Sequence, residues 1–114
     1  MYYELQVGDK VYKLRLTTRA LLQIEKNLGY NPIQMFMGIT KDNIPKLADI
    51  LIILHGMLTS LEHNITMEKT CDIFDQYTED GHTQFDLIPV FVEVFTMAGF
   101  MTANDEEEAE SKNV

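Results

Sequence analysis

Residues 45–61 read PKLADILIILHGMLTSL and contain the longest apolar stretch of the chain, which runs from Leu47 to Leu58. Ile50 through Leu54 are five apolar residues in a row, so a helix here carries apolar side chains on every face. A helix of that kind is covered on several sides by other elements. The stretch therefore predicts a central helix around which the rest of the chain folds.

The flanking residues suggest where this central helix begins and ends. Asp42 or Asn43 can cap its N-terminus, and Pro45 fits the first turn, where no backbone N–H is needed. We expect the helix to continue to about Leu61. The apolar part is too short to cross a bilayer, which takes about 20 residues, and Asp49 interrupts it.

Upstream, the first 16 residues alternate between apolar and polar side chains, as the strands of a β-hairpin do. One predicted strand covers residues 3–7 and the other covers residues 11–16. Gly8-Asp9-Lys10 forms the turn between them, because glycine can adopt a positive φ. An isolated two-stranded hairpin is marginally stable in water, so it needs support from the helices or from a second copy of the chain.

Two helices are predicted between the hairpin and the central helix. Thr17 or Thr18 can cap the first one, and Gly29 ends it, because glycine tolerates the left-handed conformation that follows a last helical turn. Asn31 then caps a short second helix that has Pro32 at its first position.

Downstream, Thr66 is expected to cap a fourth helix, and Thr83-x-x-Asp86 resembles the capping box of a fifth. This fifth helix has more apolar residues than one core-facing stripe requires. The predicted fold class is therefore mainly α, within the α+β class. It consists of an N-terminal β-hairpin followed by a compact bundle of about five helices, in a single domain of residues 1–101.

Residues 102–114 form a separate acidic segment, in which Asp105, Glu106, Glu107, Glu108 and Glu110 fall within six positions. Such a run buries too little apolar surface to offset its ordering entropy, so we expect a disordered tail. The tail either keeps the protein soluble or steers it toward a basic partner.

The net charge of −9 bears on the class of partner. Nucleic acids and anionic membrane surfaces attract basic proteins, so neither is an expected partner. The first residues, Met1 to Glu4, lack the basic and apolar regions of a signal peptide. A single cysteine, Cys71, cannot form an internal disulfide. These features lead us to expect a soluble cytosolic protein.

No group of residues in the sequence has the spacing of a catalytic or metal centre. His55 and His63 are too far apart along a helix to share a metal ion, and His55 is better explained by a local hydrogen bond at the edge of the core. The acidic residues before Gly81 are out of register for a calcium loop. Cys71, next to Asp72, is expected to be a buried structural residue. We therefore predict no enzyme activity, no metal and no cofactor.

The apolar residues that exceed the needs of the core are the candidate binding site. Three consecutive residues of the short second helix cannot all point inward, and the fifth helix poses the same problem. Methionine is common at surfaces that bind varied apolar partners. The alternative is that the monomer buries all of these side chains. The predicted partner-binding residues are Met35, Phe36, Met37, Phe91, Phe95, Phe100 and Met101.

The segment VYKLRLTTRALLQIEKNLG, residues 11–29, resembles the opening of the tail assembly chaperones of long-tailed phages that infect Gram-positive bacteria. In that family a hairpin leads through a Thr-rich cap into a helix that ends in Glu-Lys-x-Leu-Gly and is followed by Asn-Pro. The matching residues here are Glu25, Lys26, Leu28, Gly29, Asn31 and Pro32. The resemblance covers residues 1 to about 40 in sequence and the rest only in architecture.

The resemblance implies a non-catalytic chaperone of the infected host cell's cytoplasm that is absent from the mature virion. Such chaperones bind the apolar helical tape measure protein, keep it soluble and help to recruit tail tube subunits, in many cases through a longer frameshifted product. Self-association is also expected. Two other functions stay open, namely a structural phage tail or connector protein and a small acidic regulator of a basic protein.

Overall fold

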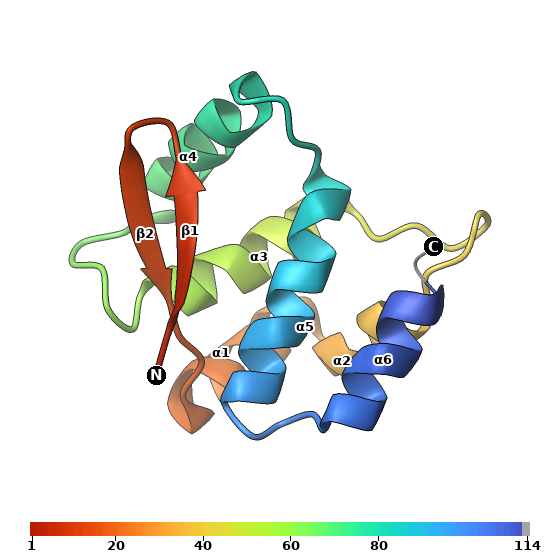
Figure 1. Ribbon diagram of the computed structural model, residues 1–114. Helices are drawn as coiled ribbons and strands as arrows, with labels where there is room; N and C mark the ends of the chain where they lie inside the picture. Colours follow the sequence, from red (N-terminus) through yellow and green to blue (C-terminus); the bar gives the residue numbers. More distant parts are fainter. Residues whose placement is uncertain (113–114) are drawn as a thin grey trace.

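Two antiparallel strands open the fold and six α-helices follow, within residues 1–112, which are the residues that the computed structural model describes (Figure 1). The predicted α+β class is confirmed. The elements are β1 (Tyr3–Val7), β2 (Lys10–Leu14), α1 (Thr18–Leu28), α2 (Pro32–Met37), α3 (Leu47–Leu58), α4 (Met67–Glu79), the 3-10 helix η1 (Gln84–Asp86), α5 (Leu87–Met97) and α6 (Ala103–Lys112).

The hairpin packs on the helices of its own chain. Its strands pair in the register that places Leu5 opposite Tyr12, and the second strand begins at Lys10, one residue earlier than predicted. Gly8 has a φ of 60°, whereas Asp9 has a negative φ, which fits a type II′ turn. The apolar face of the hairpin is buried, with β2 against α3 and β1 against α4 and α5.

Two backbone amides of the hairpin and that of the residue after it bond to the helical part. The N–H of Gly8 donates to Asp80 Oδ2 over 2.6 Å, which ties the turn to the end of α4. The N–H of Lys13 donates to Glu62 Oε1 over 2.9 Å. The N–H of Arg15 donates to the carbonyl oxygen of Met57 in α3 over 3.1 Å. The outer edge of β2 is thereby held by groups that follow or end α3.

The first two helices begin and end as predicted. Thr17 caps α1, because its hydroxyl oxygen accepts a hydrogen bond from the N–H of Ala20. Gly29 ends α1 in the left-handed conformation, with a φ of 82°. Asn31 caps α2 by accepting from the N–H of Ile33, and Pro32 occupies the first position.

Helix α3 is shorter than predicted at both ends. It begins at Leu47, after a residue that makes no side-chain cap, and it ends at Leu58. Asn43 does not cap it, since its side-chain amide donates to the carbonyl oxygen of Gly38 over 2.7 Å and its backbone pairs with Thr40. Local loop contacts therefore compete with helix formation before Leu47. The helix packs against α1, α4, α5 and β2.

The caps of the next helices are confirmed. Thr66 accepts a hydrogen bond from the N–H of Lys69 at the start of α4. Thr83 and Asp86 form a capping box, in which the N–H of Thr83 donates to Asp86 Oδ2 over 3.0 Å. The box opens the short helix η1, which continues directly into α5.

The acidic segment is helical rather than disordered, which corrects our prediction for the described part of residues 102–114. Helix α6 lies beside α2 and the end of α5 (Figure 1). Thr102 and Asp105 form a reciprocal cap at its start, and Ala109 is fully buried. Glutamate and alanine are good helix formers, which explains why the segment is helical. The segment has no large apolar residue, so its sequence gave no sign that it would pack on α2 and α5. Residues 113–114 of the predicted tail lie outside the described residues.

Candidate functional site

The aromatic residues proposed from the sequence as a binding site form one cluster between α2 and α5. The ring of Phe36 meets that of Phe95 edge to face, with centroids 5.0 Å apart, and lies 6.4 Å from Phe91. Phe95 in turn contacts Phe100, with centroids 6.5 Å apart. Edge-to-face pairs of this kind add stability beyond the area that they bury. The structure thus brings together side chains from both segments that the sequence singled out.

Most of this set is buried in the monomer. Met35, Phe36, Phe91, Phe95 and Met101 belong to the hydrophobic core. Met37 and Phe100 are only partly buried and pack against that core. The expectation that this set leaves a large apolar surface exposed is therefore corrected.

One of the elements that pack on α2 and α5 is a helix that the sequence interpretation treated as disordered. Helix α6 packs on both α2 and α5, and Ala109 joins the same core. In this conformation a partner can reach only the exposed parts of Met37 and Phe100. We call the residues Met35, Phe36, Met37, Phe91, Phe95, Phe100 and Met101 the α2–α5 cluster.

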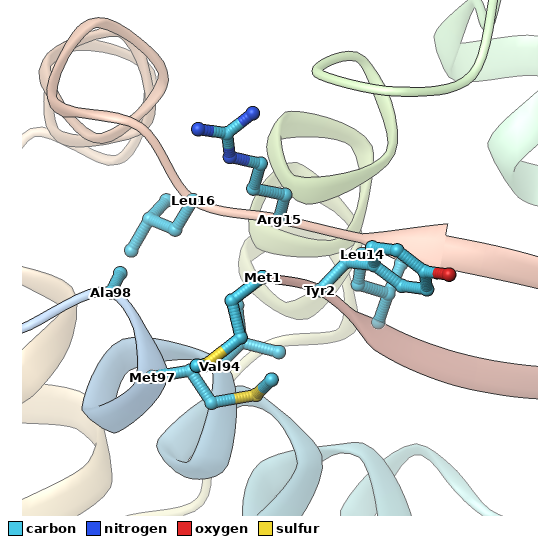
Figure 2. A pocket seen from close by; sticks show the side chains of 8 residues that line it. All are labelled: Met1, Tyr2, Leu14, Arg15, Leu16, Val94, Met97 and Ala98. Atoms are coloured by element: carbon cyan, nitrogen blue, oxygen red, sulfur yellow. The ribbon is translucent and has the colours of Figure 1, made fainter.

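A pocket of about 220 Å³ lies where the start of the chain, the end of β2 and the end of α5 meet (Figure 2). Its apolar wall is formed by Leu14, Leu16, Val94 and Met97, and Met1 extends over it. Figure 2 shows the Arg15 guanidinium pointing away from Met97. No local pattern could indicate this pocket, because its walls come from segments about eighty residues apart.

A second, larger pocket of about 360 Å³ lies beside the start of α5 and is lined by Ile39, Phe85, Asp86, Ile88 and Pro89. Phe85 is 42% exposed, which is unusual for a phenylalanine. Apolar side chains on other elements are also exposed, including Leu22 on α1 at 62% and Ile44 at 57%. Apolar surface is therefore spread over several sites and is not concentrated at the α2–α5 cluster.

Two side chains that could carry chemistry have been located. His55 Nε2 lies 2.9 Å from the carbonyl oxygen of Ile65, which is the local hydrogen bond expected of it. Cys71 is exposed on α4, so our expectation of a buried thiol was wrong. The neighbouring core positions of α4 are taken by Ile73, Phe74 and Tyr77, and Cys71 falls on the other face of the helix.

The perturbed pKa values have structural causes. Burial and a 2.9 Å hydrogen bond to Asp49 raise the pKa of Tyr30 to about 12. Burial, with the nearby charge of Asp86, raises the pKa of Tyr77 to about 12. A tyrosine with such a pKa stays protonated at neutral pH and cannot serve as a base. The N–H of Gly8 lowers the pKa of Asp80, which stabilises that carboxylate in the hairpin contact.

The buried ring of Tyr77 lies beneath an exposed polar pair, His82 and Asp86. The ring of His82 stacks on it with centroids 4.3 Å apart, and His82 Nδ1 lies 3.3 Å from Asp86 Oδ2. Within residues 1–112 no group of three or more potential ligands is arranged to hold a metal ion. None of the helices described is long and apolar enough to cross a membrane.

No curated protein and no solved structure matches the chain. A family of unknown function matches it over residues 2–114. The match includes the hairpin and every helix described above, so it concerns the whole fold. The chain therefore belongs to this family, DUF6096.

Proposed function

We propose that this protein is a tail assembly chaperone of a long-tailed phage, which binds the apolar helical tape measure protein and keeps it soluble until the tail tube forms. The observation that carries the proposal is the segment from Val11 to Pro32, whose residues match the opening of that chaperone family. Its local structure fits the same reading, with a hairpin, the Thr17 cap, the left-handed Gly29 and the Asn31 cap in order.

The physical properties of the chain suit a protein that covers an apolar helix. A long apolar helix needs apolar contacts, and the α2–α5 cluster brings aromatic and methionine side chains of two helices together. The complex must also remain soluble. A net charge of −9 keeps coated filaments apart by mutual repulsion.

The proposal includes the partners and the location that the resemblance implies. The tape measure protein is the client, and tail tube subunits are recruited to the coated client, through a longer frameshifted product where one is made. The protein acts in the host cytoplasm, associates with copies of itself along the client and is absent from the mature virion. A structural tail or connector protein would instead remain in purified particles, and an acidic regulator would bind a basic partner in a salt-sensitive way.

Co-expression with the tape measure protein encoded beside it tests the proposal. We expect the tape measure protein to be insoluble alone and to copurify in a soluble, stoichiometric complex when both are made together. If the tape measure protein stays insoluble, the proposal is wrong. Purified virions should then be searched for this chain, which would support a structural role.

Two matched substitutions test where the client binds. Met37→Glu changes a partly exposed member of the α2–α5 cluster and should lower the yield of soluble complex about tenfold or more. Leu22→Glu makes the same kind of change at a more exposed residue of α1 and should leave the yield unchanged. Equal effects of the two variants would contradict the α2–α5 cluster as the contact surface.

A further inference from the structure

We propose that α6 is a displaceable cover and that the surface of α2 and α5 beneath it is a docking site for an apolar helix of a partner. The identity of the partner as the tape measure protein rests on the proposed function, but the docking site does not. The first argument is that this surface already holds a helix, since α6 packs on both α2 and α5 (Figure 1).

Helix α6 is weakly anchored for an element that covers a core. Its sequence, ANDEEEAESK, has no apolar residue larger than alanine. Ala109 is its one described side chain that is fully buried, and Ala103 is exposed. Alanine offers little apolar area, so the free energy gained when α6 docks is small compared with that of an ordinary amphipathic helix.

Charge adds to this weakness. Asp105, Glu106 and Glu107 are consecutive, and among the side chains that the structure describes no basic one forms an ion pair with any of these three. Carboxylates near the helix N-terminus are favourable, but like charges three residues apart on a helix, as Asp105 and Glu108 are, repel one another. The first turn is held by Thr102, whose N–H and hydroxyl both donate to Asp105 Oδ2. The start of the helix is thus well capped, whereas its contact with the body depends on a small apolar area.

The surface beneath α6 is of the opposite character. Phe36 and Phe95 pack edge to face between α2 and α5, and Phe100 joins them from the short connection that leads into α6. Met37 of α2 and Phe100 are already partly exposed. Movement of α6 would carry this connection with it and uncover more of the α2–α5 cluster.

A partner helix with large apolar side chains would bury more apolar area on this surface than α6 does. The exchange of α6 for such a helix is therefore favourable, whereas another acidic, alanine-based helix would not displace it. Without a partner, α6 shields the aromatic cluster from self-aggregation. In the complex, the released acidic segment adds charge at the surface of the coated client.

Hydrogen exchange and dye binding test the cover in the protein alone. Backbone amides of α6 should exchange at least tenfold faster than those of α3 and α5, since α6 opens without global unfolding. Ala109→Glu should undock α6 and raise the fluorescence of the apolar dye ANS severalfold. Ala103→Glu, the same change at an exposed position of the same helix, should leave the fluorescence at the wild-type level. Slow exchange in α6, or equal dye binding by the two variants, would overturn the proposal.

The complex with the tape measure protein gives the second test. When the client binds, hydrogen exchange of the backbone amides should slow in α2 and α5 and accelerate in α6. The Ala109→Glu variant should bind the client more tightly than the Ala103→Glu variant. A complex that forms with α6 still protected would refute displacement and leave the chaperone function standing. If no complex forms, the proposed function fails, and the exchange and dye measurements on the protein alone still decide whether α6 is a cover.

Discussion

At the scale of single residues, Gly56 of α3 marks a close approach between two helices. A Cβ atom added there would lie 2.4 Å from Ile24 Cγ1 and 2.5 Å from Ile24 Cδ1 in α1. Ile24 is almost fully buried, so its side chain has little space to move away. Glycine is needed here for packing, because it lets α1 and α3 approach, and not for an unusual backbone conformation.

We expect Gly56→Ala to lower the free energy of unfolding by about 1–2 kcal/mol, because overpacking outweighs the better helix propensity of alanine. Urea denaturation measures the change. Ile24→Ala removes both clashing atoms, so the double variant should lose at least about 0.5 kcal/mol less than the sum of the two single variants. Strict additivity would show that the two residues do not compete for the same space.

Tyr30 and Asp49 form another pair that joins separate elements. The Tyr30 hydroxyl donates to Asp49 Oδ2, and burial together with this bond raises the pKa of Tyr30 to about 12 from its ordinary value of 10. The fold therefore favours the protonated phenol. This contribution to stability is complete below pH 10 and is lost as the pH rises toward 12.

Tyr30→Phe should therefore cost about 1 kcal/mol at neutral pH and reduce the loss of stability between pH 10 and pH 12. Urea denaturation at a series of pH values measures both effects. Tyr2→Phe is the control, since Tyr2 is exposed and makes no hydrogen bond to a carboxylate in the described residues. A Tyr30→Phe profile parallel to the wild-type profile would contradict this assignment.

At the scale of elements, helix ends follow from one or two side chains each. The side chains of Thr17, Asn31 and Thr66 each accept a hydrogen bond from an N–H in the first turn of the helix that follows. Helix α3 has no such side chain, and Asn43, which could have capped an earlier start, is engaged in loop contacts instead. A capping residue in the sequence therefore predicts a helix start reliably only when its side chain does not form a hydrogen bond within the preceding loop instead.

Thr17→Ala should destabilise the protein by about 1 kcal/mol, because the N–H of Ala20 loses its partner. Thr18→Ala is a matched control, since Thr18 is the first residue of α1 and its hydroxyl caps nothing. Thermal unfolding followed by circular dichroism measures the difference between the two variants. A larger effect of Thr18→Ala would reverse the assignment of the cap.

At the scale of the whole molecule, the hairpin is an integral part of the core. Leu5, Val7 and Leu14 are buried beneath it, and β1 and β2 pack against three different helices. The hairpin is therefore stabilised within the monomer, and pairing with a second copy is not needed for its stability. Any self-association has to use other surfaces, for example the one around the exposed Phe85.

Leu5→Asp should unfold or strongly destabilise the monomer, by about 3 kcal/mol or more, because it buries an unpaired charge. Gln6→Asp adds the same charge at the next, exposed position and should change stability by less than about 0.5 kcal/mol. Urea denaturation and light scattering compare the variants. A folded Leu5→Asp monomer with lost oligomers would show that the hairpin packs between chains.

The sequence predicted most of the strands and helices, but it did not predict which apolar side chains are exposed. The hairpin and the caps at Thr17, Asn31 and Thr66 were predicted because each depends on residues within a few positions of one another. Helix α6 was missed, because its contact with the body is made by an alanine that no apolar pattern marks. The expectation that Phe36 and Phe95 remain available to a partner came from the surplus of apolar residues in two helices, and it did not include a further helix that packs on both.

Local signals by themselves determined the order of strand and helix, most helix boundaries and the acidic net charge. These depend on backbone conformation, side chains near in sequence and total charge. Only the tertiary structure decided that the α2–α5 cluster is internal, that Cys71 faces outward and that segments far apart form the pocket beside Met97. Burial depends on which elements meet, and in this chain a helix of low apolar content packs on α2 and α5, the helices that carry Phe36 and Phe95.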